Sequence, residues 1–161
     1  EVSTFVYESV PDFFSDPYFL KEVEPAILEE LQTPERMSRM ANSRSAQGYK
    51  AALQVAMANV GALDDAGVRI AMGTDTGPPA RFQGYFEHME MHMMVDAGMS
   101  PLDAIRASTG VAADCIGMGD IGTLEPGKWG DFSILGANPV ADILNTKTIE
   151  SVYIAGNRVP E

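Results

Sequence analysis

The residue best placed to do chemistry is Asp75, within the stretch RIAMGTDTG at residues 69–77. An apolar run leads into Gly73, and Asp75 follows it, just before Gly77 and two prolines. Functional sites of parallel α/β proteins gather at the carboxyl ends of strands. A carboxylate there can bind a metal ion, act as a general base, or do both. The local pattern fits an alternative equally well: an Asx-turn, in which Asp75 only accepts a hydrogen bond from the backbone of Thr76 or Gly77.

The two histidines, His88 and His92, are four residues apart within FEHMEMHMM. On a helix this spacing places both on one face, where they could bind zinc. The glutamates Glu87 and Glu90 do not form the H-E-x-x-H arrangement, and the neighbouring methionines are more typical of packing. An independent zinc site at His88 and His92 is therefore a minor alternative, and a role of His88 alone on the substrate side is favoured over it.

Composition argues against several classes of partner. The 161 residues include 23 acidic and 11 basic side chains, which gives a net charge of −12. Nucleic acids and anionic membrane surfaces both need clustered Lys and Arg, so neither is an expected partner. No apolar run reaches the roughly 20 residues of a membrane span. The single cysteine, Cys115, excludes an intrachain disulfide and is expected to be buried. A cytoplasmic location is expected because reducing compartments lack disulfides.

The elements that must position these residues follow from apolar spacing, prolines and capping residues. Strands are indicated by β-branched and continuous apolar runs, and helices by a period near 3.6 that begins at a capping residue followed by proline. The predicted strands are Val2–Tyr7 and Val68–Gly73; the predicted helices are two short turns after Asp16-Pro17 and Pro25, one long helix over 34–66, and helices over 82–97 and 101–118.

The pattern changes after Met118. The segment DIGTLEPGKWGDFSIL indicates strand, turn and strand, with Pro126 and Gly127 at the centre of a type II turn. The segment SVYIAGNRV indicates a short hairpin that turns at Gly156-Asn157. The order β, α, β, α, α and then several short strands predicts an α/β fold, in which the first strands are parallel and joined by a right-handed crossover.

Four stretches together resemble one family. GVRIAMGTDTG, HMEMHMMVDAGMSPLDAIRASTGVAADCIGM, IGTLEPGKWGDFSIL and VYIAGNRV, in this order, resemble the amidohydrolase superfamily, most closely its imidazolonepropionase-like and prolidase-like metal-dependent hydrolases. The resemblance implies the C-terminal part of a (β/α)8 TIM-like barrel, with Val2–Tyr7 and Val68–Gly73 as strands 7 and 8, each with its helices. Residues 1–118 would be this barrel part, and residues 119–161 would add short strands to a small β-sandwich.

The resemblance also implies roles for individual residues. Asp75 matches the eighth-strand aspartate of the family, which binds a divalent metal ion, here expected to be zinc. In that role it takes the proton from the metal-bound water that attacks an amide or other C–N carbonyl. Thr76, Gly77 and His88 would lie on the substrate side. The substrate would be a small molecule: an amide, a peptide or a cyclic amide.

The sequence departs from the family in what it lacks. It contains no H-x-H pair and no upstream Lys or His ligand, because the first six strands are absent. Two parallel strands cannot close a barrel, and their open edges would favour pairing with another chain. We therefore expect a fragment that is inactive alone and needs the missing part of the barrel or a homo-oligomer partner. The alternatives are a non-catalytic association module and one subunit of a split enzyme.

Overall fold

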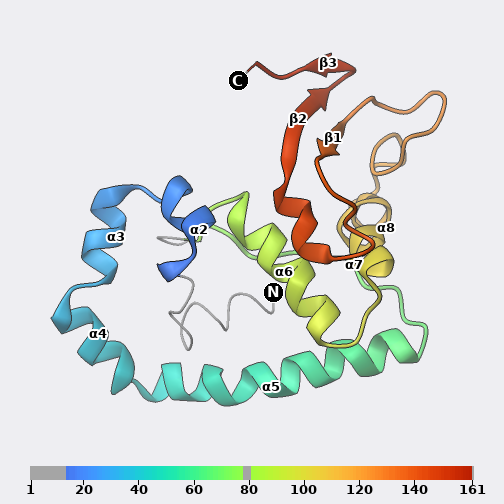
Figure 1. Cartoon of the computed structure of the whole chain (residues 1–161). Helices are drawn as coiled ribbons and strands as arrows, with labels where there is room; N and C mark the ends of the chain where they lie inside the picture. Colours follow the sequence, from blue (N-terminus) through green and yellow to red (C-terminus); the bar gives the residue numbers. More distant parts are fainter. Residues whose placement is uncertain (1–13, 78–80, 161) are drawn as a thin grey trace.

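The computed structural model describes residues 14–77 and 81–160, so the predicted strand Val2–Tyr7 lies outside the described residues. A series of helices is followed by a small sheet (Figure 1). The helices are α2 (Pro17–Glu22), α3 (Pro25–Leu31), α4 (Pro34–Ala41), α5 (Arg44–Asp65), α6 (Tyr85–Asp96), α7 (Pro101–Ser108), α8 (Gly110–Cys115) and the 3-10 helix η2 (Ile143–Lys147); the strands are β1 (Phe132–Leu135), β2 (Ile149–Ile154) and β3 (Asn157–Arg158).

The predicted turns at the two early prolines are confirmed as α2 and α3, each with proline at its start. The prediction of a single long helix over 34–66 is wrong, because the helix is interrupted between α4 and α5. The Asn42 amide donates to the Ser38 carbonyl, and the Ser43 hydroxyl accepts from the amide of Ala46 to cap α5. Such polar side chains compete with the helical backbone for its hydrogen bonds. The break thus has a local cause.

Two apolar clusters meet on α6, which crosses the middle of the molecule above α5 (Figure 1). In the first, Phe19 of α2 packs edge-on against Tyr85 and Phe86, with ring centroids 5.1 and 6.5 Å away. These three are the largest fully buried side chains. The second cluster contains Met91 and Met94 with residues of α7 and η2. The methionines of α6 are therefore core residues, as the sequence indicates.

The predicted strand Val68–Gly73 is wrong. This stretch forms no strand and connects α5 to α6 as an irregular segment. The Met72 amide donates to the Ala107 carbonyl over 2.9 Å, and the Arg69 guanidinium pairs with Asp114. A strand exists only where a neighbour completes its hydrogen-bond ladder. No strand of the described part of the chain lies beside this one.

The helix predicted over 101–118 is divided at Thr109, whose φ of −123° and ψ of −94° are not helical. The hydroxyls of Ser108 and Thr109 both donate to the Ile105 carbonyl, which again offers the backbone an alternative to the helix. Cys115, at the end of α8, is exposed rather than buried.

The sheet is antiparallel, in the order β1-β2-β3. Phe132 of β1 stacks on Tyr153 of β2, with ring centroids 4.6 Å apart. The hairpin between β2 and β3 is confirmed, but its turn lies at Ala155-Gly156, one residue earlier than predicted. The type II turn at Pro126-Gly127 is confirmed by the bond from the Lys128 amide to the Glu125 carbonyl, whereas the strand predicted before this turn is absent.

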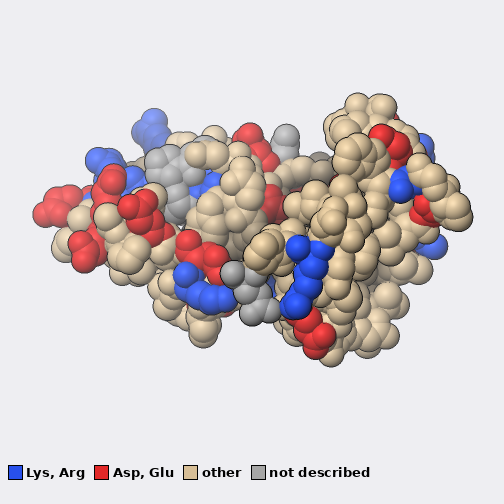
Figure 2. Space-filling model, turned by 90° about the horizontal axis from the view of Figure 1, so that it is seen from above, with Lys and Arg blue, Asp and Glu red and all other residues tan. Residues whose placement is uncertain are grey.

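The surface is large and uneven in charge. The face drawn in Figure 2 carries interleaved acidic and basic side chains at the end of α3 and α4, and fewer charged side chains of both signs, among uncharged ones, at the opposite end. The accessible surface of the chain is 9546 Å², roughly a fifth more than the about 7,800 Å² expected of a compact monomer of this mass.

None of the helices within residues 14–77 and 81–160 could cross a membrane.

The contact between α5 and the end of α6 depends on a glycine. A β-carbon added at Gly61 would overlap the carbonyl oxygen of Ala97, whereas one added at Gly48 of the same helix would meet nothing within 4 Å. We expect Gly61→Ala to lower the free energy of unfolding by about 1–3 kcal/mol through overpacking. The matched control, Gly48→Ala, should raise it by about 0.5–1 kcal/mol because alanine favours the helix. Urea unfolding of both variants tests this, and a stabilised Gly61→Ala protein would contradict the packing.

Candidate functional site

Asp75 lies on an exposed turn with an unusual backbone. Its φ is +56°, in the left-handed region that only a few per cent of non-glycine residues adopt, Asp among the more tolerant of them. The amide of Gly77 donates to the carbonyl of Arg81 over 2.7 Å rather than to Asp75, so the Asx-turn alternative is wrong. Within residues 14–77 and 81–160, the Asp75 carboxylate has no hydrogen-bond partner and is open to a ligand.

The residue before Asp75 ties this turn to the start of α6. Thr74 is buried, and its hydroxyl donates to Oε1 of Glu87 over 3.0 Å. The other carboxylate oxygen of Glu87 accepts from the amide of Gly84 over 2.6 Å, which caps the first turn of the helix. The Thr76 hydroxyl oxygen lies 3.4 Å from that of Thr74. One carboxylate thus connects the turn at Asp75 to the helix that follows it.

His88 follows Glu87 on α6 and is half-buried. Its Nδ1 lies 2.9 Å from the hydroxyl oxygen of Thr146. That hydroxyl donates its own proton to the Ile143 carbonyl, so Nδ1–H is the donor and Nε2 is left as an acceptor. Burial lowers the pKa of His88, the positive charge of Lys147 lowers it further, and Glu87 opposes the shift. The structure therefore favours a neutral ring.

A polar cluster near His88 joins Asp16, at the start of the described chain, and η2 to α6. Asp16 accepts from the Lys147 ammonium over 3.1 Å and from the Tyr85 hydroxyl over 3.0 Å. The ammonium also lies 5.6 Å from the ring centroid of Tyr18 and 5.1 Å from that of Tyr85, a cation–π distance. Burial, and then the hydrogen bond to Asp16 and the negative charge of that carboxylate, raise the pKa of Tyr85. Sequence analysis missed Lys147 because nothing local links it to a residue 131 positions away.

The histidine pair is not assembled as a zinc site. His92 is half-buried and its Nε2 lies 3.8 Å from Asp96 on the same helix, while Nδ1 of His88 is hydrogen-bonded to Thr146. No group of three or more His, Cys, Asp or Glu side chains within residues 14–77 and 81–160 could hold a metal ion. These residues alone therefore do not fit a complete divalent metal site, although Asp75 could be one ligand of such a site.

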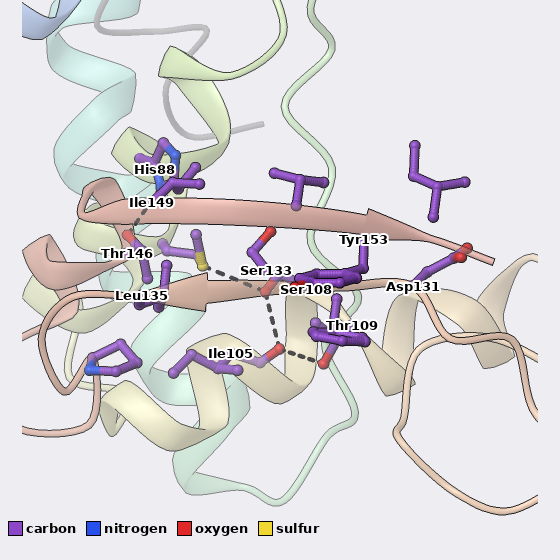
Figure 3. A pocket seen from close by; sticks show the side chains of 15 residues that line it. His88, Ile105, Ser108, Thr109, Asp131, Ser133, Leu135, Thr146, Ile149 and Tyr153 are labelled. Carbon is purple, nitrogen blue, oxygen red and sulfur yellow. Dashed lines mark hydrogen bonds between the residues drawn. The ribbon is translucent and has the colours of Figure 1, made fainter. Parts of the chain in front are cut away.

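A cavity of about 570 Å³ lies between the sheet and helices α6 and α7 (Figure 3). Most of its lining is apolar, and several of its polar side chains already have partners in the protein: the Ser108 and Thr109 hydroxyls donate to the Ile105 carbonyl, and Asp131 accepts from the Ala155 amide. His88 lies at one end of it in Figure 3. Asp75, Thr76 and Gly77 do not line it. The structure thus places only His88, among the predicted site residues, at this cavity.

The sequence and the fold of the chain resemble those of known proteins over most of its length. Residues 25–159 match the model of the amidohydrolase family. The chain belongs to the amidohydrolase family. Its mixture of helices and short strands is compatible with a part of the barrel fold of amidohydrolases.

Several relatives of this amidohydrolase chain are hydrolases. An imidazolonepropionase of Deinococcus deserti is 33% identical over 101 residues, which are 60% of this chain and 25% of that protein. The structure of phenylurea hydrolase B is 29% identical, with a TM-score of 0.58 over 89% of this chain and 31% of that one. A Xaa-Pro dipeptidase with methionine bound in its active site is 25% identical, with a TM-score of 0.60 over 84% of this chain and 32% of that one. The amidohydrolase chain thus spans only a quarter to a third of these relatives.

The environment of His88 predicts a measurable titration. We expect its pKa, followed by NMR, to lie below the ordinary 6.5, and Lys147→Gln to raise it part of the way by removing a nearby positive charge. Burial, the larger cause, remains in that variant. Lys128→Gln, which removes a lysine paired with Glu125 instead, should leave the His88 pKa unchanged.

The same shift has a consequence for stability. Because the pKa of His88 is lowered in the folded state, the neutral His88 ring contributes to the free energy of unfolding, and this contribution is fully present above pH 6.5. It is lost as the pH falls through the folded pKa, since the unfolded chain then binds the proton more readily. A His88 pKa at or above 6.5 would contradict the geometry.

Proposed function

We propose that this amidohydrolase chain supplies Asp75 to the active site of a metal-dependent hydrolase of amide or other C–N bonds. The observation that carries the proposal is an exposed carboxylate without a hydrogen-bond partner among the described residues, on a turn whose neighbours are bonded. Family membership supports a hydrolase of amide-type substrates. The names of two relatives, a phenylurea hydrolase and a Xaa-Pro dipeptidase, support a small substrate that contains a C–N bond.

Asp75 would be one ligand of a divalent ion, for which we propose zinc. When bound, such an ion polarises the substrate carbonyl and lowers the pKa of a water molecule toward 7. Asp75 would hold the ion and accept the proton, since a carboxylate at hydrogen-bond distance serves as a general base. Thr76 and Gly77 would border the substrate because they adjoin this carboxylate. His88, with Nδ1–H donated to Thr146, would offer Nε2 as an acceptor.

The other metal ligands would come from polypeptide beyond these 161 residues. Within the described part of the chain no metal-binding group of three side chains exists, and the chain spans 25% of the imidazolonepropionase that it matches. We propose that the chain is inactive alone, that residues 1–118 belong to the barrel and that residues 119–161 belong to a β-sandwich. The missing barrel part, or a second copy of the chain, would cover its open surface.

A non-catalytic association module is the second candidate, and one observation favours it. Exposed apolar side chains lie at the end of the molecule that holds the sheet, and the apolar cavity opens beside them. Patches of this kind mark interaction sites. In this case the chain would associate with itself or a partner in sedimentation experiments, and its assembly would bind no metal.

We expect Asp75→Asn to lower kcat/KM of the assembled hydrolase by about 10²–10⁴, the contribution of a general base, and to reduce its metal content. The asparagine keeps the size of the side chain but cannot accept the proton. Asp96→Asn is the matched control, because Asp96 is an exposed aspartate that lies beside His92 and has no proposed role in the site. Rates with an amide substrate and metal analysis measure both effects. Near-normal turnover in Asp75→Asn would contradict the assignment and favour the association module.

The zinc alternative at His88 and His92 makes a separate prediction. Because the structure directs the two rings to different partners, the double variant His88→Ala/His92→Ala should retain the zinc content of the unmodified assembly. Metal analysis at equal protein concentration decides this. A loss of one zinc ion in His92→Ala alone would support the helical site, since His92 has no other proposed role.

A further inference from the structure

We propose that Glu87 is a positioning residue that fixes the backbone of Asp75, through its hydrogen bond to Thr74. The inference rests on the role proposed above for Asp75. Both oxygens of the Glu87 carboxylate are used: one accepts from the Thr74 hydroxyl over 3.0 Å, and the other from the Gly84 amide over 2.6 Å. The carboxylate therefore connects the two ends of the loop between Asp75 and α6.

The turn needs such support because its backbone is unfavourable. A φ of +56° at Asp75 brings the β-carbon close to the following carbonyl oxygen and costs about 1–2 kcal/mol in a non-glycine residue. Asp75 has no hydrogen bond of its own to offset this cost within the described part of the chain. Its neighbours provide the restraint: Thr74 is buried and bonded to Glu87, and the Gly77 amide donates to Arg81.

This arrangement separates two tasks. The bonds on either side of Asp75 hold the backbone, so the carboxylate itself stays available for a ligand. An Asx-turn would have fixed the same backbone with the Asp75 carboxylate and would have occupied it. The Thr74–Glu87 bond thus does what an Asx-turn would do and leaves the functional group open. A metal-binding or catalytic carboxylate requires a fixed position, and hydrogen bonds made by the adjacent residues can provide it.

A helix cap alone does not account for the geometry. Asp103, the third residue of α7, makes ordinary local cap contacts with Ser100, three residues before it. Glu87 holds the same position in α6, but it also reaches Thr74, which is 13 residues away in sequence. Loss of that bond would remove the nearer acceptor of a buried hydroxyl, which lies 3.0 Å away against 3.4 Å for the Thr76 hydroxyl. Asp103 is therefore a matched control that caps a helix without touching the turn.

The test compares four variants of the 161-residue chain by NMR: Thr74→Val, Thr74→Ser, Glu87→Ala and Asp103→Ala. Thr74→Val and Glu87→Ala should shift the backbone signals of Asp75 in the same direction and speed exchange of the Gly77 amide about tenfold, as expected for the loss of one buried hydrogen bond. Thr74→Ser keeps the hydroxyl and should restore the signals of the unmodified chain. Asp103→Ala should weaken α7 and leave the Asp75 signals unchanged.

The double variant Thr74→Val/Glu87→Ala completes the test. If one bond joins the two residues, the double variant should change exchange at Gly77 no more than Glu87→Ala alone. Additive effects would overturn the proposal. It is also overturned if Glu87→Ala alters only the signals of α6 while Thr74→Val leaves Asp75 unchanged, because Glu87 would then be a helix cap only. Because Thr74→Val and Glu87→Ala remove the same bond from its two ends, either variant that folds still tests the proposal.

Activity separates the inference from the function on which it rests. In the assembled hydrolase, Glu87→Ala should lower kcat about tenfold with little change in KM, because a displaced carboxylate weakens the transition state more than substrate binding. If Asp75→Asn abolishes turnover while Glu87→Ala leaves kcat unchanged, the positioning role fails and the proposed function stands. If Asp75→Asn has no effect, the proposed function fails, whatever the NMR shows for Thr74 and Glu87.

Discussion

The first turn of α6 buries Tyr85 and Phe86 against Phe19 of α2, and the position of nearly every other group discussed above follows from this contact. Burial of aromatic rings contributes a large apolar area and a defined geometry. Once the turn is seated, Glu87 faces Thr74 and His88 faces Thr146. Helix α6, with 12 residues, therefore contacts the turn that carries Asp75 on one side and borders the cavity beside the sheet on the other.

The polar groups around that turn of α6 serve packing more than catalysis. Lys147 is held between a carboxylate and two aromatic rings, and Tyr85 donates to Asp16. Each charge or hydroxyl has its partner, as burial requires. Asp75 is the contrast, because its carboxylate is exposed and has no hydrogen-bond partner in the described part of the chain. The hydrogen bonds at this turn are thus made by the neighbours of Asp75, and the Asp75 carboxylate itself stays open.

Local rules predicted local features well. Prolines and capping residues placed α2, α3 and the start of α7, and the type II turn at Pro126-Gly127 follows from the same chemistry. The breaks before α5 and at Thr109 were missed, although Ser and Thr side chains at those points carry the signal. For the bond from Thr74 to Glu87, the sequence indicates only that Glu87 stands at a capping position. It does not indicate that Thr74 is its partner. Contacts such as Asp16 with Lys147 depend on the tertiary fold and have no local signature.

The segment Val68–Gly73 presents the sharpest conflict between sequence and structure. Its continuous apolar composition is that of a strand covered on both faces, yet it forms no strand and Val68 remains 48% exposed. Natural sequences seldom contradict their own fold in this way. The conflict disappears if another strand pairs with this segment, because the ladder would satisfy its backbone and cover its side chains. The same pairing would hold Asp75 at the end of a completed strand, which is the position that our proposal for Asp75 as a metal ligand requires.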